Sequence, residues 1–106
     1  MYIRYDDMDM IEFFENEPIT IGEEGEGMLI YTLKDGTSLG LTLTVDAYAK
    51  TIDIGIAYNK DIIFSGEFEN IIEIKKSEND LVLCKEGGSR ILLKKYPCLG
   101  AIIEKE

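Results

Sequence analysis

Carboxylates that could bind a cation or a cationic protein are concentrated at the start of the chain. The 106 residues carry a formal net charge of −10, and residues 1–26 account for −8 of it. In that segment a single base, Arg4, accompanies nine acids, which are Asp6, Asp7, Asp9, Glu12, Glu15, Glu17, Glu23, Glu24 and Glu26. Residues 27–106 are nearly neutral, with twelve acids against ten bases. A surface this anionic repels nucleic acid and acidic membranes and attracts a positively charged partner.

Two patterns within this segment resemble ligand-binding motifs but lack the required spacing. An EF-hand calcium loop needs alternating oxygen ligands, a central glycine and a closing glutamate, whereas apolar residues interrupt the run that begins with Asp6-Asp7-x-Asp9. The stretch GEEGEG at 22–27 has the glycines of a phosphate-binding loop, but its three carboxylates would repel a phosphate. We therefore expect no metal and no cofactor.

The residue types also disfavour an enzyme. The chain contains no histidine, which removes the commonest general base and the Ser-His and Cys-His nucleophile pairs. Cys84 and Cys98 are expected to be small core residues rather than nucleophiles. A pair of carboxylates for glycoside hydrolysis could come from one outer sheet face carrying Asp53, Glu67 and Glu69, but a domain of this size has little room for a sugar cleft.

Part of the acidic segment, residues 6–15, is predicted to be a short helix. Asp6 or Asp7 can cap its N-terminus. Its apolar side, which should dock on a sheet, consists of Met10, Ile11, Phe13 and Phe14. A second side aligns Asp9, Glu12 and Glu15. Because Glu12 and Glu15 repel each other near the negative end of the helix dipole, packing of the two phenylalanines must hold the helix in place.

The remainder reads as short antiparallel strands. Apolar residues alternate on both sides of the turn at 46–50 within Thr37–Tyr58, which is typical of a hairpin with one dry face. Further strands are expected at 19–21, 28–34, 62–68, 71–76, 81–85, 89–95 and 99–105, with a tight turn at Asp35-Gly36 and a bulge or bend at Gly66. This pattern predicts a single mainly β domain over 1–106, a meander of about eight strands that forms a barrel or a two-layer sandwich with one N-terminal helix on a face or at an end.

Composition sets the expected location and oligomeric state. Apolar residues make up 45% of the chain, but no apolar run approaches the length of a membrane span. The opening residues do not form a secretory signal, and two cysteines give no disulfide framework, so a cytoplasmic protein is expected. Unpaired strand edges allow a monomer or a weak homodimer. The lysine pairs at 75–76 and 94–95 are expected to be solvated.

The sequence resembles the small acidic immunity proteins of bacterial polymorphic-toxin and contact-dependent growth inhibition systems. The resemblance covers Ile30 to Ile74 and is carried by DGTSLGLTLTVDAYAKTIDIGIAYN followed by DIIFSGEFENI, together with the chain length and the clustered negative charge. It implies a cytosolic antidote that binds a cognate toxin domain, commonly a cationic nuclease such as a ribonuclease, and covers its active site.

The residues and the resemblance together give one main functional hypothesis. The partner-binding residues are predicted to be Asp6, Asp7, Asp9, Glu12, Glu15, Glu23, Glu24, Glu26 and Tyr48, with Tyr2 and Tyr5 as further aromatic anchors. Such a protein would contact no nucleic acid or membrane directly. The alternative is a small β-barrel module that binds a ligand or peptide in an apolar cavity and uses its acidity only for solubility.

Overall fold

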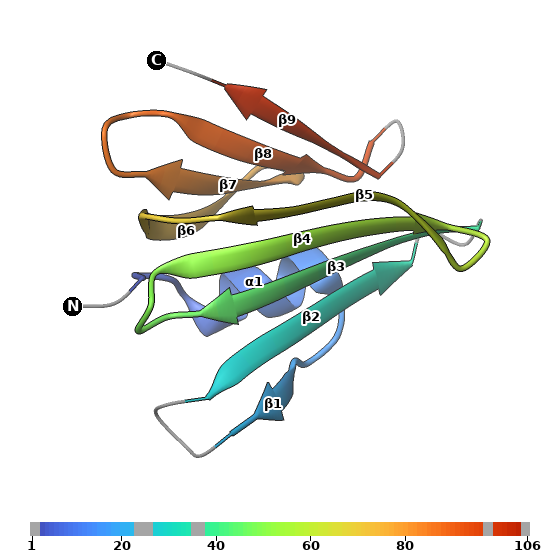
Figure 1. Cartoon of the computed structure of the whole chain (residues 1–106), viewed down its shortest axis with the longest axis horizontal. Coiled ribbons are helices and arrows are strands. Elements are labelled where there is room, and N and C mark those ends of the chain that lie inside the picture. Colours follow the sequence, from blue (N-terminus) through green and yellow to red (C-terminus); the bar gives the residue numbers. More distant parts are fainter. Residues whose placement is uncertain (1–2, 23–26, 35–37, 97–98, 105–106) are drawn as a thin grey trace.

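One helix and nine strands make up the part of the chain that the structure, a computed structural model, describes (Figure 1), namely residues 3–22, 27–34, 38–96 and 99–104. The helix is α1 (Asp7–Phe14). The strands are β1 (Ile19–Ile21), β2 (Met28–Lys34), β3 (Leu39–Asp46), β4 (Thr51–Tyr58), β5 (Asp61–Phe68), β6 (Ile71–Ser77), β7 (Asp80–Lys85), β8 (Arg90–Lys94) and β9 (Gly100–Glu104).

The strands form two antiparallel sheets in which every strand pairs with its neighbour in sequence. The first sheet has the order β1-β2-β3-β4-β5 and the second the order β6-β7-β8-β9. The chain passes between the sheets at Glu69-Asn70, where Asn70 adopts a positive φ of 60°. The predicted mainly β meander is confirmed, and of the two architectures left open the described strands form a sandwich rather than a closed barrel.

The β3–β4 hairpin has the predicted alternation. Its strands pair in continuous register from Leu39 opposite Tyr58 to Asp46 opposite Thr51. The inward residues are buried and belong to the core, namely Leu41, Leu43, Val45, Ile52, Ile54 and Ile56. In the turn, the Asp46 side chain accepts a hydrogen bond from the Ala49 backbone N–H at 3.1 Å. The predicted turn at Asp35-Gly36 lies outside the described residues.

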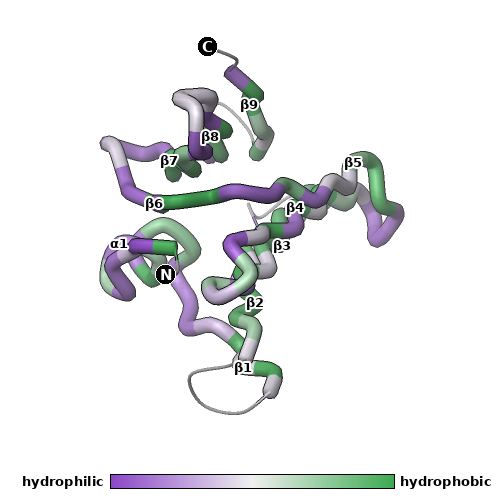
Figure 2. The backbone as a smooth tube through the Cα atoms, turned by 60° about the vertical axis from the view of Figure 1, so that its left-hand side comes forward, coloured by the Kyte–Doolittle hydropathy of each residue, from purple (hydrophilic) through white to green (hydrophobic). Residues whose placement is uncertain are grey.

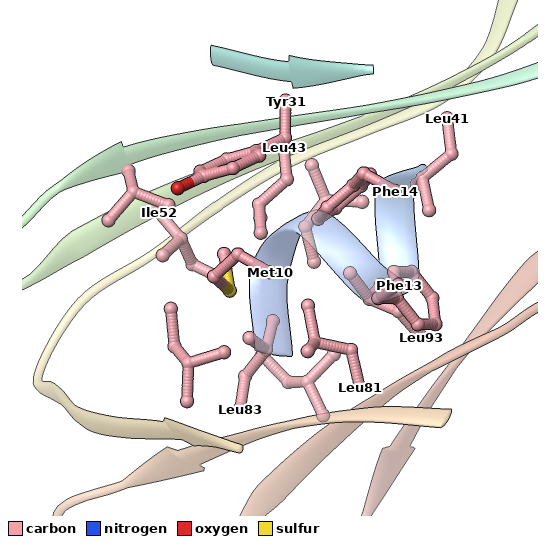
Figure 3. Close-up of a cluster of buried hydrophobic side chains, with 14 of the residues drawn as sticks. Met10, Phe13, Phe14, Tyr31, Leu41, Leu43, Ile52, Leu81, Leu83 and Leu93 are labelled. Carbon is pink, nitrogen blue, oxygen red and sulfur yellow. The ribbon is translucent and has the colours of Figure 1, made fainter. Parts of the chain in front are cut away.

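Helix α1 packs its apolar side into the angle between the two sheets, so it contacts both inner faces rather than the single face or end that the sequence predicted. Figure 2 shows it in the angle between the sheets, where it contacts β2 and β6. Met10, Phe13 and Phe14 are fully buried. In Figure 3, Met10 and Phe13 lie between Leu43 and Ile52 of the first sheet and side chains of the second that include Leu81, Leu83 and Leu93. An apolar side this broad on a helix of eight residues is wide enough to cover both inner faces.

The bulge in β5 lies at Ile63, so the prediction that placed it at Gly66 is wrong. The register shifts because Ile56 opposes Phe64 while the next residue, Ala57, opposes Ile62. Gly66 pairs regularly with Ile54. Glycine at this position instead leaves room for two aromatic rings, since a Cβ there would come within 3.2 Å of the Phe68 ring and 3.4 Å of the Phe64 ring. The bulge leaves Ile62 and Ile63 exposed at the edge of the first sheet.

Candidate functional site

An open pocket of about 560 Å³ lies beside the start of α1. We call it the tyrosine pocket, because three phenol side chains line it from three different segments. Tyr5 comes from the segment before the helix, Tyr31 from β2 and Tyr48 from the β3–β4 turn. The lining also includes the acids Asp7 and Glu17, Gly27, and the apolar Ile11, Leu29 and Val45.

Backbone hydrogen bonds of residues 3 and 4 hold this side of the pocket in place. The Ile3 N–H donates to the Ala47 carbonyl at 3.1 Å, next to Tyr48 in the turn of the first sheet. The Arg4 N–H donates to the Ile72 carbonyl at 3.0 Å, and the Arg4 carbonyl accepts from the Ile74 N–H at 2.8 Å. The N-terminal segment therefore joins the two sheets, pairs with β6 and fixes where Tyr5 and the helix begin.

Asp6 caps the helix, as one of the two candidates that the sequence offered. Its side chain accepts a hydrogen bond from the Met8 backbone N–H at 2.8 Å, and its own backbone is extended, with a φ of −104°. An N-cap of this kind typically contributes about 1 kcal/mol to helix stability. Asp7, the next residue, does not cap the helix and instead lines the tyrosine pocket.

The phenols of Tyr5 and Tyr31 stay protonated under ordinary conditions because their pKa values are raised. Tyr31 is 1% exposed, and its ring stacks on Phe14 with centroids 5.1 Å apart. Burial raises the pKa of Tyr31 far above its usual range, and nearby Tyr5 and Asp7 raise it further. Burial and the Asp7 carboxylate also raise the pKa of Tyr5. The pocket therefore combines neutral hydroxyls with a negative potential from Asp7.

The acids in the later part of the helix are paired with lysines of the second sheet. Glu12 lies 3.6 Å from the Lys76 ammonium, and Glu15 lies 3.2 Å from that of Lys95. The Lys95 ammonium also sits 5.0 Å from the centroid of the Phe13 ring. With 14% of its side chain exposed, Lys95 is not the solvated lysine that the sequence predicted. The second sheet thus relieves the repulsion expected between Glu12 and Glu15.

The predicted partner-binding residues fall into four groups. Asp7 and Tyr48 meet in the tyrosine pocket. Asp6 is the helix cap, and Asp9 is half-buried on the same helix. Glu12 and Glu15 are each paired with a lysine. Glu23, Glu24 and Glu26, like the anchor Tyr2 and the thiol of Cys98, lie outside the described residues.

Sequence reasoning missed Tyr31 and Glu17 as members of a site. Tyr31 lies at an inward position of β2, where the alternating pattern marks it only as core. A tyrosine at such a position is itself a signal, because a buried phenol usually keeps its hydroxyl near a polar group or water. Glu17 lies between α1 and β1, and nothing local distinguishes it from the other acids.

Other features predicted from the sequence lie away from the pocket. Asp53 and Glu67 face each other across β4 and β5 on the exposed side of the sheet, and Cys84 is half-buried in β7. Within the described ranges, no cluster of three or more potential metal-ligating side chains occurs. The helix that the structure describes is too short and too polar to cross a membrane.

Comparison with known proteins gives a match in fold but not in sequence. No protein-family model matches the chain, and no curated protein matches it. A solved structure that does match is the contact-dependent growth inhibition toxin–immunity protein complex from Klebsiella pneumoniae 342. A chain of that complex superposes with a TM-score of 0.81 over 98% of both chains, at 15% sequence identity. The fold of this protein, helix included, is therefore similar to that of a component of a toxin–immunity complex, in agreement with the resemblance seen in its sequence.

Proposed function

We propose that this protein is an immunity protein, which binds and neutralises a cognate toxin domain in the cytoplasm. The observation that carries the proposal is the match in fold, over 98% of both chains, to a chain of a toxin–immunity complex. Such a complex contains two kinds of protein. The net charge of −10 favours the inhibitor, because a nuclease toxin needs positive groups to hold phosphates.

The proposed contact surface is the pocket side of α1 together with the acidic stretch that follows β1. Asp7 supplies a carboxylate on the pocket side of the helix, Asp9 lies on another side of it, and Glu23, Glu24 and Glu26 follow in the chain. Gly27, the first described residue after them, lines the tyrosine pocket. On a toxin with a cationic active site, these carboxylates would occupy the positions that RNA or DNA phosphates otherwise take, and the toxin would be covered at its active site.

Charge and aromatic contacts have different tasks in this proposal. Carboxylates at the rim of an interface mainly raise the association rate and select a basic partner. Exposed tyrosines such as Tyr48 supply the contact area that slows dissociation. The complex should therefore form quickly at low salt and weaken steeply as salt is added.

The test measures binding to, and protection from, a basic toxin domain, which the proposal expects in the neighbouring reading frame. Reversing Asp9, Glu23, Glu24 and Glu26 to lysine is expected to weaken binding roughly tenfold or more at low salt and to abolish protection of the producing cell. The matched control reverses four acids of the β4–β5 region, namely Asp53, Asp61, Glu67 and Glu69, and is expected to bind nearly as the parent does. Equal loss in both variants, or loss in neither, contradicts the assigned surface.

A second candidate function follows from the tyrosine pocket. Its volume lies within the range of small-molecule sites, and its lining mixes apolar side chains with a few polar groups. A binding module for a small ligand or peptide would keep its affinity at high salt and could carry its ligand through purification. Native mass spectrometry of the purified protein separates the two candidates, because an immunity protein is expected to be recovered without a small ligand.

A further inference from the structure

The two carboxylates of the tyrosine pocket differ from Glu12 and Glu15 in forming no ion pair within the described residues. Glu12 and Glu15 are each within 4 Å of a lysine ammonium, at 3.6 and 3.2 Å. Asp7 and Glu17, which line the pocket, form no ion pair with any lysine or arginine that the structure describes. The pocket thus holds up to two uncompensated negative charges at a concave surface, where a positive group would be attracted.

The rest of the lining suits a flat cation on an aliphatic stem. Tyr5 and Tyr48 present aromatic rings, whose faces attract cations, while the buried Tyr31 forms the pocket wall behind them. Ile11, Leu29 and Val45 supply apolar surface along which methylene groups can pack. Phenol hydroxyls and carboxylates accept hydrogen bonds, and the raised pKa of Tyr5 and Tyr31 means that these two phenols add no negative charge to that of the acids.

We propose that the tyrosine pocket binds the guanidinium group of one arginine side chain presented by the toxin. This inference rests on the proposed function and adds the chemistry that anchors the partner. A guanidinium is planar, stacks on aromatic rings and donates in a fork that fits a carboxylate. A lysine ammonium is more strongly hydrated and cannot stack, so the pocket should prefer arginine.

The protein's own described arginines do not fill this role. Arg90 lies in β8, where it donates to the Glu104 carboxylate at 2.6 Å. Arg4 pairs through its backbone with β6, is exposed, and forms no ion pair with a described carboxylate. Because neither arginine is paired with Asp7 or Glu17, both carboxylates are left available to a cation from another molecule.

The experiment titrates the full-length protein with N-acetyl-L-arginine amide and follows backbone and tyrosine-ring NMR signals at low salt. The capped compound represents an arginine within a chain. Two related compounds serve as controls. The citrulline analogue has nearly the same shape as the arginine compound but no charge, and the lysine analogue has the charge but no planar guanidinium group. We expect saturable shifts at the pocket residues, about tenfold weaker binding of the citrulline analogue, and weaker binding of the lysine analogue.

A pair of variants ties the signal to the two acids. The double substitution Asp7→Asn with Glu17→Gln is expected to weaken binding of the arginine compound about tenfold. Asp53→Asn with Glu67→Gln removes the same charge from the outer side of β4 and β5 and should leave binding unchanged. Equal binding of arginine and citrulline analogues, shifts centred outside the pocket, or no saturable shifts at all would overturn the proposal.

The outcomes also separate this inference from the proposed function. If the arginine compound does not bind but the neighbouring toxin does, the pocket assignment is wrong and the immunity function stands. If free arginine binds much more tightly than the capped form, the pocket recognises a small metabolite, which overturns the proposal in favour of the ligand-binding alternative. If the capped compound binds as expected but no basic protein partner is inhibited, the immunity function is the part that fails.

Discussion

The two ends of helix α1 carry the same kind of charge in different surroundings. At the first turn, Asp7 lines an open pocket together with Tyr5. At the last turn, Glu15 is paired with Lys95, which in turn sits over the Phe13 ring. Acids of one short segment therefore lie in different surroundings: Glu15 is compensated within the fold, whereas Asp7 lines an open pocket and forms no ion pair with a described base. A cluster of charge in a sequence does not by itself define one binding surface.

Both ends depend on the same aromatic anchor. Phe13 and Phe14 contact each other edge to face, with ring centroids 5.0 Å apart, and both are fully buried. Phe14 continues the contact to Tyr31 in the wall of the pocket. Packing of this pair holds the helix between the sheets, since a helix of eight residues is not stable by itself.

The largest expected effect comes from removing that anchor. Phe14→Ala should lower the free energy of unfolding by about 3–5 kcal/mol, because it leaves a cavity between the sheets and removes the ring that supports Tyr31. Urea unfolding measures the change. Met8→Ala, at an exposed position of the same helix, is the control and should cost less than about 0.5 kcal/mol. A loss below about 1 kcal/mol for Phe14→Ala would mean that the helix is not held by this contact.

Raising the pH above 10 should lower the free energy of unfolding through Tyr31, at the pocket end of the helix. The pKa of Tyr31 in the folded protein lies above its ordinary value of 10.0, so below pH 10 both folded and unfolded chains keep this phenol protonated. Above pH 10 the unfolded chain loses this proton while the folded chain keeps it. Deprotonation therefore favours the unfolded state, and the free energy of unfolding falls as the pH rises.

Urea unfolding on either side of pH 10 measures this loss, and Tyr31→Phe should remove much of it. Tyr58→Phe, at an exposed tyrosine, is the matched control and should leave the pH dependence as in the parent protein. A pH dependence that is the same in both variants would place its origin in other groups.

Charge reversal at each end of the helix tests the comparison directly. Asp7→Lys removes a negative charge from the pocket, whereas Glu12→Lys places a second cation beside Lys76. Each should cost only about 0.3–1 kcal/mol of stability, through the helix dipole at one end and lost pairing at the other. Toxin binding, measured by calorimetry at low salt, should weaken about tenfold more for Asp7→Lys than for Glu12→Lys. If the order is reversed, the paired acids face the toxin and the pocket does not.

The strands were largely predictable because their signal is local. Alternation in β3 and β4 assigns an inner face whichever strands lie next to it, and the turn residues between them limit the register. The bulge at Ile63 has no such signal, since two adjacent isoleucines fit either register. The apolar side of α1 was also visible, but a period of 3.6 residues does not say how many sheets that side will meet.

The site could be predicted only in part, because it is assembled from segments far apart in sequence. Asp7 and Tyr48 were chosen for charge and for aromatic character, and the turn between β3 and β4 brings Tyr48 to the helix start. The contact between Glu15 and Lys95 joins residues 80 positions apart, and no local pattern indicates which carboxylates will be neutralised in this way. Charge density was therefore visible in the sequence, but its division between the two ends of the helix was not.

The smallest expected effect concerns Glu15, whose backbone ends the helix in the left-handed region at φ 59° while its N–H donates to the Ile11 carbonyl at 2.7 Å. Glycine adopts that conformation without steric cost, and an exposed ion pair contributes little. Glu15→Gly should therefore leave the free energy of unfolding unchanged or raise it by about 0.5 kcal/mol. Glu15→Gln, which keeps the strain and loses the charge, should lower it by a few tenths of a kcal/mol. If Glu15→Gly instead costs more than about 1 kcal/mol, the pair with Lys95 over the Phe13 ring is a main support of the helix. The ion pair at this end then stabilises the fold more than its exposure to solvent indicates.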